Sequence, residues 1–384
     1  MDDEPGATVT HTLFSPLALG DLVLPNRIVM APLTRSRATP DRVPTPMMAE
    51  HYVQRAAAGL IIAEATNVVP QSNAWECTPG IFTDLQIDAW RDLVAAVHQA
   101  GGRIALQLWH GGRVSATRSA DAPMPLSPSA VNDDLDAVTV WGRNEEGKFA
   151  KLAATPSRAM TLDEVHATIA AFGAAAGAAR AAGFDAVQLH AANGYLPHQF
   201  LSAHLNRRVD EFGGSPEARA RFALEVVTAM LPHFPRGRVG LRISPFAPFN
   251  GAIDPDPWPT YTYLLRELEE RGLGWLELAD SNFWSGQFDR DAMLQLARPV
   301  FDGPIIVNGG IDPATGDALV RERKAEAVSF GRLWIANPDL PERIRLGGPY
   351  TIKALTRRFY GGGADGYNDY PTLTEERAAA SSQA

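Results

Sequence analysis

The chain contains very little cysteine: among its 384 residues, Cys77 is the only one. A single thiol excludes an internal disulfide, a cysteine-rich zinc site and an iron–sulfur cluster. The sequence also lacks a run of about 20 apolar residues that could span a bilayer. Its N-terminus has neither the basic start nor the apolar core of a signal peptide. We therefore expect a soluble, cytoplasmic protein.

A second absence concerns nucleotide-binding motifs. No Gly-x-Gly-x-x-Gly string follows any apolar run, and the nearest string, Gly272-Leu273-Gly274, precedes one and lacks the third glycine. A separate dinucleotide-binding domain is therefore not expected. The formal net charge of -9 argues against nucleic acid or an anionic membrane surface as the main partner.

The sequence does have a regular alternation of short apolar runs with longer amphipathic segments. The apolar runs are β-branched or nearly continuous in hydrophobicity, which is typical of parallel strands buried on both faces. Eight strands are predicted: Arg27–Leu33, Leu60–Glu64, Arg103–Trp109, Ala186–His190, Val239–Ile243, Trp275–Leu278, Pro304–Val307 and Ala327–Phe330.

Several of the intervening segments carry helix start signals. Thr83 with Gln86, and Thr161 with Glu164, have the spacing of a capping box. Three further helices are predicted to begin at a cap residue followed by proline: Ser215-Pro216, Asp312-Pro313 and Asn337-Pro338.

Eight strand–helix pairs favour one closed α/β barrel over an open doubly wound sheet, and the whole chain 1–384 is expected to form a single domain. An N-terminal hairpin should precede the barrel. Residues 111–160 are expected to form a capping insertion after the third strand, over the barrel mouth. A C-terminal tail follows from about residue 346, and residues 375–384, small and polar, are expected to be disordered.

The chemistry of such a barrel lies at the carboxyl ends of its strands, where the βα loops converge. Glycine-containing turns follow the last two strands, Gly309-Gly310 and Gly331-Arg332. Backbone N–H groups at a helix start bind an anion closely where no side chain intrudes, and an arginine adds a fixed charge. This pattern indicates a phosphorylated ligand.

Gln107 and Arg242 are unusual in a barrel otherwise filled with aliphatic residues. A buried guanidinium costs several kcal/mol unless it meets an anion or a carboxylate. Arg242 could therefore form a structural ion pair with Glu64 or Glu277, or it could face a bound anion.

The loop after the fourth strand brings His190, Asn193 and Tyr195 within five residues of one another. By themselves, these residues could be satisfied side chains that stabilise an irregular loop. Their place at the functional face of the barrel favours a common pocket instead.

Other candidate sites are weaker. Glu64, Glu277 and Asp280 could be a glycosidase pair, but the sequence does not fix their separation. His110 and His190 lack metal-motif spacing, so no metal is expected. Cys77 has no basic neighbour and is interpreted as an ordinary small residue.

Taken together, these residues resemble the Old Yellow Enzyme family, in particular its N-ethylmaleimide and pentaerythritol-tetranitrate reductase type. The resemblance covers nearly the whole chain and places Thr34 and the His-Asn pair at matching positions. The matching segments are Leu13–Leu17, Asn26–Arg35, Gly59–Thr66, Gln107–His110, His190–Tyr195, Gln199–Leu201, Asp210–Ser215, Phe330–Leu340 and Phe359–Gly363.

The resemblance implies a (β/α)8 TIM barrel that binds FMN tightly without a covalent bond. Residue by residue, it implies that His190 and Asn193 bind the substrate oxygen, that Tyr195 donates a proton, and that Trp109 and Tyr360 form pocket walls. The implied cofactor-binding residues are Pro32, Leu33, Thr34, Ala65, Gln107, Arg242, Gly309, Gly310, Gly331 and Arg332.

The implied function is that of an ene-reductase, an NAD(P)H-dependent flavin oxidoreductase. By this resemblance, NADPH or NADH reduces the flavin, and an alkene activated by a carbonyl or nitro group is then reduced in the same pocket. The chain is expected to be a monomer or homodimer. Two alternatives are a catalytically silent flavin-binding barrel and a lyase or isomerase acting on a phosphorylated ligand. Most such lyases need a strand-end lysine or a carboxylate base, and no predicted strand ends in lysine.

Overall fold

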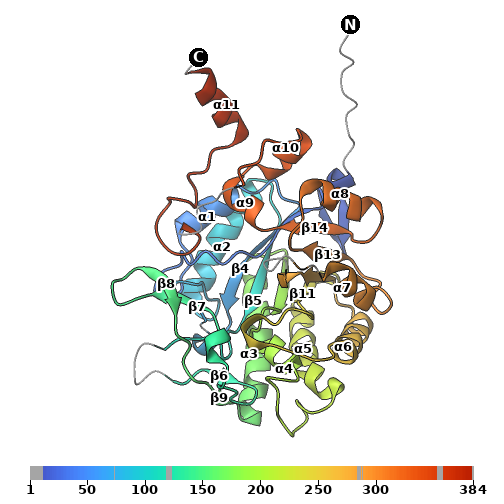
Figure 1. Cartoon of the computed structure of the whole chain (residues 1–384). Coiled ribbons are helices and arrows are strands. Elements are labelled where there is room, and N and C mark those ends of the chain that lie inside the picture. Colours follow the sequence, from blue (N-terminus) through green and yellow to red (C-terminus); the bar gives the residue numbers. More distant parts are fainter. Residues whose placement is uncertain are drawn as a thin grey trace.

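The computed structural model describes residues 12–72, 74–117, 123–282, 287, 289–352 and 358–382. Eight parallel strands close into a barrel in the order β10-β11-β12-β13-β14-β3-β4-β5, with helices around it (Figure 1). The strands are β3 (Ile28–Met30), β4 (Leu60–Asn67), β5 (Ile104–Trp109), β10 (Ala186–Ala191), β11 (Val239–Ile243), β12 (Trp275–Ala279), β13 (Ile305–Asn308) and β14 (Ala327–Phe330). All eight predicted strands are thus present, and the barrel prediction is confirmed.

The strands are apolar because both of their faces are buried. Every residue of β4, β5, β10, β11 and β12 is buried. One face packs inside the barrel and the other packs under the helices, which removes the alternation of an exposed strand. The register of β4 against β5 shifts between Ala63 and Thr66, and β4 continues past its predicted end at Glu64 to Asn67.

The expected N-terminal hairpin is also present. Strands β1 (Leu17–Leu19) and β2 (Leu22–Leu24) pair antiparallel around a tight turn in which Gly20 has φ 61°. A Cβ at Gly20 would lie 2.0 Å from the backbone oxygen of Arg236, so only glycine fits there. The hairpin leucines form a cluster with inward residues of the barrel, including Trp275, and close the barrel's amino end.

Most of the helices lie around the outside of the barrel (Figure 1). They are α1 (Pro46–Val53), α2 (Asp84–Gln99), α3 (Leu162–Ala181), α4 (Leu196–Leu201), α5 (Pro216–Met230), α6 (Trp258–Arg271), α7 (Arg290–Ala297), α8 (Pro313–Arg321), α9 (Arg332–Ala336), α10 (Leu340–Arg345) and α11 (Leu373–Ser381). None of the helices in the described ranges is long and apolar enough to cross a membrane.

Most of the helix start signals are confirmed. Both predicted capping boxes are formed, with Thr83 at the start of α2 and Thr161 at the start of α3. Ser215 caps α5 and Asp312 caps α8, each followed by proline at the first helical position.

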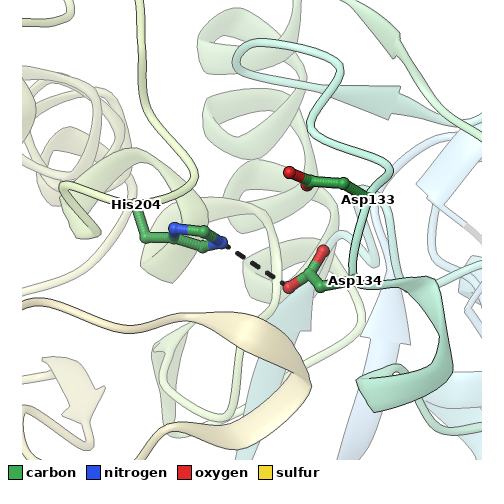
Figure 2. A group of neighbouring side chains, drawn as sticks. All are labelled: Asp133, Asp134 and His204. Carbon is green, nitrogen blue, oxygen red and sulfur yellow. Dashed lines mark ion pairs between the residues drawn. The ribbon is translucent and has the colours of Figure 1, made fainter.

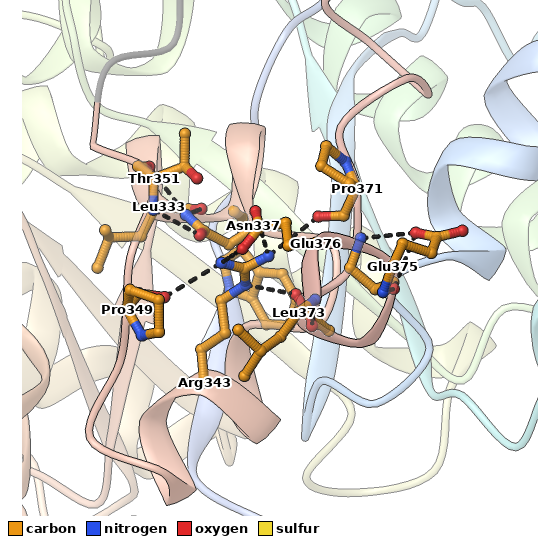
Figure 3. Close-up of polar contacts among 12 residues, drawn as sticks. Leu333, Asn337, Arg343, Pro349, Thr351, Pro371, Leu373, Glu375 and Glu376 are labelled. Carbon is orange, nitrogen blue, oxygen red and sulfur yellow. Dashed lines mark hydrogen bonds and ion pairs between the residues drawn. The ribbon is translucent and has the colours of Figure 1, made fainter. Parts of the chain in front are cut away.

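The third cap-and-proline prediction is wrong. Helix α10 begins at Leu340 after Asp339, two residues beyond the predicted start at Asn337-Pro338. The side chain of Asn337 is used elsewhere: its Nδ2 donates to Leu333 O (2.7 Å) and Thr351 O (3.0 Å), and its Oδ1 accepts from Thr351 N (2.9 Å) (Figure 3). A bond to a distant segment therefore replaces the expected cap.

The segment after β5 forms two small sheets. Strands β6 (Leu126–Ser127) and β9 (Arg158–Ala159) pair with each other, as do β7 (Val140–Arg143) and β8 (Phe149–Leu152). Thr139 N donates to Asn250 Oδ1 (2.8 Å) in the loop that follows β11. The expected insertion thus lies over the carboxyl ends of the strands.

The expected disorder at the C-terminus is also wrong for the described residues. Helix α11 projects from the body of the molecule (Figure 1) and begins with a third capping box, formed by Thr372 and Glu375. The buried Arg343 anchors it: Nη2 donates to Glu376 Oε1 (3.0 Å) and Pro371 O (3.0 Å), and Nε donates to Asp339 Oδ1 (2.7 Å) (Figure 3). Composition alone did not show this anchor.

We predict that Arg343→Met lowers the free energy of unfolding by about 3 kcal/mol, because Asp339 and Glu376 lose their buried cation. Arg345→Ala is the matched control, since Arg345 makes a 3.6 Å exposed pair with Glu342 and a cation–π contact with the ring of Phe14 (4.4 Å). That variant should change stability by about 1 kcal/mol or less. Urea denaturation measures both values, and equal losses in the two variants would contradict the anchoring role.

Candidate functional site

Closure of the barrel brings the predicted residues to one end of the molecule. They lie at the carboxyl ends of strands, in the loops that follow, or in the C-terminal segment. The residues in or directly after β3 and β4 are Pro32, Leu33, Thr34 and Ala65. Those in or directly after β5, β10 and β11 are Gln107, Trp109, His190, Asn193, Tyr195 and Arg242. Those that follow β13 and β14 are Gly309, Gly310, Gly331 and Arg332, and Tyr360 lies in the C-terminal segment.

The floor of this site is a buried polar cluster. The guanidinium of Arg242 pairs with the carboxylate of Glu277 through Nη1 and donates from Nη2 to Asn308 Oδ1 (2.8 Å). Gln107 Nε2 donates to Gln188 Oε1 (2.8 Å). The predicted ion pair of Arg242 therefore exists, and its partner is Glu277.

Glu64, the other partner considered for Arg242, has a different role. Its Oε2 accepts from the backbone N–H of Arg35 (3.2 Å) and its Oε1 accepts from Tyr52 Oη (3.4 Å). Burial raises the pKa of Glu64 to about 7, against the lowering effect of these backbone N–H groups and of the Arg35 charge. Glu64 therefore supports the start of the loop after β3.

His190 is held as a neutral donor. Its Nδ1 accepts from the backbone N–H of Ala192 (3.4 Å), so the ring proton is assigned to Nε2. Burial lowers the pKa of His190 well below the usual value, and the nearby Arg242 charge lowers it further. Nε2–H therefore remains available as a neutral donor.

Asn193 is fixed by three contacts around a backbone φ of 57°. Its N–H donates to Ser244 Oγ (2.9 Å), its carbonyl accepts from Asn250 Nδ2 (2.8 Å), and its side-chain oxygen accepts from Ser281 Oγ (2.5 Å). Among the residues that the structure describes, the side-chain nitrogen has no hydrogen-bond partner. The loop is thus well satisfied, yet it keeps one amide donor for a ligand.

Tyr195 lies between two rings. Its ring centroid is 4.9 Å from that of Trp109 and 4.8 Å from that of His190, both in edge-on arrangements. Burial, followed by the effect of Tyr360, raises the pKa of Tyr195 far above the usual value. Its hydroxyl therefore carries a proton throughout the neutral range.

Tyr360 reaches the site from the distant C-terminal segment. Its ring contacts Trp75 (4.8 Å between centroids) and Trp141 (5.1 Å), two residues that the sequence did not identify. Arg35 Nε donates to Phe359 O (2.8 Å), which fixes the neighbouring backbone. The insertion contains only two aromatic residues, Trp141 and Phe149, so its sequence carried no signal that it would pack against residue 360.

Glycine turns follow β13 and β14 at the site. Gly309 (φ 108°) and Gly310 (φ 58°) follow β13, and a Cβ at Gly309 would lie 2.3 Å from the backbone oxygen of Asp280. A Cβ at Gly331 would meet nothing nearer than 3.4 Å, so its absence leaves open space before α9. Arg332 is exposed at the first position of that helix. These features suit a phosphate group.

One group of potential metal ligands lies in the described ranges, outside this site. One ligand atom from each of Asp133, Asp134 and His204 lies within 4.8 Å of the others (Figure 2). Asp134 pairs with the buried guanidinium of Arg113, and His204 Nε2 is 3.7 Å from the same carboxylate. The negative charge of Asp134 is thus already matched by Arg113, and we interpret the group as an ion-pair cluster.

The described residues fit a flavin mononucleotide in three respects. Gln107 Oε1 accepts no hydrogen bond from any described residue and could accept one from a ring N–H. The cation of Arg242 lies nearby, across β10, and the glycine turns provide an anion site. A barrel that combines these features defines a flavin-dependent oxidoreductase.

Comparison with known proteins identifies the family. Residues 12–350 match the NADH:flavin oxidoreductase / NADH oxidase family. The chain is 38% identical to 12-oxophytodienoate reductase 1 of Oryza sativa subsp. japonica, over 96% of this chain and 95% of that protein. It is also 38% identical to a probable flavin mononucleotide-dependent alkene reductase of Leishmania infantum, over 94% and 97%.

Solved structures agree with these sequence relatives. Morphinone reductase superposes with a TM-score of 0.90 at 43% identity, covering 96% of this chain and 98% of that chain. The Old Yellow Enzyme homologue from Zymomonas mobilis gives a TM-score of 0.87 at 37% identity, covering 94% and 100%. The chain belongs to the NADH:flavin oxidoreductase / NADH oxidase family, which is that of the Old Yellow Enzymes. The prediction of an FMN-dependent, NAD(P)H-driven ene-reductase is confirmed at the level of this family.

We predict that His190 stays neutral, with its proton on Nε2, through the pH range in which a free histidine becomes protonated. A free histidine takes up a proton below about pH 6.5, but the depressed pKa of buried His190 keeps the folded form uncharged. By linkage, the contribution of His190 to stability is complete above about pH 6.5 and declines as the pH falls.

Long-range ¹H–¹⁵N spectra of protein labelled with [¹⁵N]histidine measure this state directly. His190→Asn assigns the resonance, because only the His190 signal should disappear. An imidazolium signal for His190 at pH 6, or a neutral ring protonated on Nδ1, would contradict the assignment.

Proposed function

We propose that this chain reduces carbon–carbon double bonds activated by a carbonyl or nitro group, with His190 and Asn193 as the oxygen-binding pair and Tyr195 as the proton donor. One observation carries the proposal: the loop after β10 presents two neutral donors without protein partners in the described ranges, and the ring of His190 lies 4.8 Å from that of the protonated Tyr195. The names of the relatives, which include oxophytodienoate and alkene reductases, support the same substrate class.

The proposal assigns the remaining predicted residues to FMN. Pro32, Leu33, Thr34 and Ala65 would line the ring system; Gln107 and Arg242 would bind its pyrimidine edge; and Gly309, Gly310, Gly331 and Arg332 would hold the phosphate. When bound, FMN supplies a group that accepts a hydride from NADPH or NADH and passes one to the alkene. Because both reactants would use one pocket, no dinucleotide-binding domain is needed.

His190 and Asn193 would act on the charge that develops at the substrate oxygen. As the β carbon of the alkene becomes saturated, negative charge builds up on the carbonyl or nitro oxygen. His190 Nε2–H and the side-chain N–H of Asn193 would donate to it, and removal of one such donor costs about 3 kcal/mol of barrier. Ser281 and Ser244 would hold Asn193 in the required orientation.

Tyr195 would supply the proton to the α carbon. Its raised pKa keeps the hydroxyl protonated until a strongly basic carbon is presented. General acid catalysis of this kind contributes roughly 10²–10⁴ in rate. Trp109 and His190 fix the ring from two sides, and Tyr360 would form a further wall of the pocket.

The two other candidate functions are less well supported. A lyase or isomerase needs a free base, but Glu277 is paired with Arg242, and Glu64 accepts hydrogen bonds from the loop after β3. The same contacts argue against a glycosidase pair. A catalytically silent flavin protein would have no use for two oriented donors in the loop that carries Tyr195.

A visible absorption spectrum of the purified protein tests the function. We expect a flavin band that bleaches with anaerobic NADPH or NADH and returns when 2-cyclohexen-1-one is added. A protein that stays colourless after incubation with FMN would refute the proposal. A band that bleaches but does not return would contradict the proposed reduction of an activated alkene.

We predict that Tyr195→Phe keeps nicotinamide-driven flavin reduction within about twofold of wild type and slows alkene reduction by roughly 10²–10⁴. The reason is that the phenylalanine retains the ring contacts but has no proton to donate. Rapid-mixing absorbance measures the two half-reactions separately. Loss of flavin reduction in this variant would show that the assigned role of Tyr195 is wrong.

A further inference from the structure

A buried carboxylate organises the polar cluster beneath the site. Glu277 lies on β12 and is 0% exposed. Its Oε1 receives the guanidinium of Arg242 and the hydroxyl of Ser329 (2.6 Å), while its Oε2 accepts from Gln188 Nε2 (2.8 Å). Glu277 therefore joins side chains from three other strands of the barrel.

The hydrogen bonds in this cluster have a defined direction. An ionised carboxylate can only accept, so Gln188 must turn its amide nitrogen toward Glu277. The oxygen of Gln188 then accepts from Gln107 Nε2 (2.8 Å). This leaves Gln107 Oε1 as an acceptor with no partner among the described residues. The charge of Glu277 thus decides which atom of Gln107 is presented to a ligand.

The same carboxylate weakens the electric field of Arg242 at the site. The guanidinium side chain is 9% exposed, whereas that of Glu277 is 0% exposed, so the pair is buried at its acidic end. Parallel register places Arg242 beside Glu277 on one neighbouring strand and beside His190 on the other. A carboxylate at this place reduces the field that Arg242 exerts on the site.

A buried ion pair can be purely structural, because it neutralises a charge that folding has enclosed. That explanation accounts for Glu277, Arg242 and the donors that satisfy the carboxylate, but not for the continuation of the relay from Gln188 to Gln107. The relay extends from Glu277 to a partnerless acceptor at the site, two side chains away. This arrangement suits the recognition of a ring N–H.

We propose that Glu277 is a positioning residue for FMN: through Gln188 it sets Gln107 to accept from the N3–H of the flavin, and through Arg242 it restrains the rise in reduction potential that an unpaired cation would cause. This inference rests on the cofactor assignment of Gln107 and Arg242 in the proposed function. It adds two residues, Glu277 and Gln188, which have no direct contact with the flavin in this scheme.

Glu277→Gln tests the electrostatic part. The variant has the same shape but no charge, so Arg242 should stabilise the reduced flavin anion more strongly. We expect the equilibrium between oxidised and reduced flavin to shift at least tenfold toward reduced, a rise of about 30 mV for a two-electron couple. Ser329→Ala is the matched control, because it removes a neutral hydrogen bond to the same oxygen and should leave the potential unchanged.

Gln188→Met tests the relay. It breaks both amide bonds while keeping the ion pair of Glu277 and Arg242. We expect FMN to bind about tenfold more weakly and the N3 resonance of [¹⁵N]FMN to move upfield, with the reduction potential close to that of wild type. Each measurement is made on the FMN-loaded holoenzyme. If Glu277→Gln does not fold, the N3 resonance in Gln188→Met decides the proposal.

Gln107→Leu separates this inference from the proposed function. If Gln107→Leu changes neither FMN affinity nor the N3 resonance, the cofactor assignment of Gln107 is wrong and the relay fails with it. If Gln107→Leu changes both but Gln188→Met and Glu277→Gln match wild type, the cofactor assignment stands and the role of Glu277 is refuted.

Discussion

The charge of Arg242 is the constraint around which the inside of the barrel is arranged. A guanidinium enclosed by a strand barrel is tolerated only with an anion and with partners for its N–H groups. Glu277 supplies the anion from the neighbouring strand, and Asn308 supplies a neutral acceptor. Glu277 in turn needs further donors, which brings Gln188 and Ser329 into the cluster. One buried cation thus accounts for most of the polar groups in an otherwise aliphatic interior.

The hydrogen-bond partners of the site residues are arranged in a similar way. His190 and Asn193 each use one polar atom to fix their orientation and keep another for a ligand. Burial leaves both His190 and Tyr195 uncharged, because a charge without a partner would be costly in that environment. In the proposed function, neutral and oriented donors of this kind would stabilise charge that appears only during the reaction, which is the requirement for transition-state binding.

The mouth of the barrel depends on segments that are distant in sequence. Arg35 and Arg37 follow the first barrel strand and donate to backbone oxygens between residues 358 and 366. Both guanidinium groups also lie over the ring of Tyr367. These contacts fix the backbone beside Tyr360, whose ring packs against the insertion through Trp141. The insertion and the C-terminal segment therefore support each other over the strand ends.

The sequence by itself determined the number and kind of strands, because burial on both faces requires continuous apolar runs that are easily recognised. It also determined the chemical types at the strand ends, and hence the family, since these are properties of single residues in order. The tertiary structure alone decided which groups meet. Strand order places β11 next to β12 and separates it from β4 by β10 and β5, so Arg242 pairs with Glu277 and not with Glu64. The tertiary structure likewise decided that Asn337 accepts a hydrogen bond from Thr351 and does not cap a helix, and that Arg343 binds Glu376 of α11. Pairings of this kind depend on distances through space, which local propensity and residue spacing do not encode.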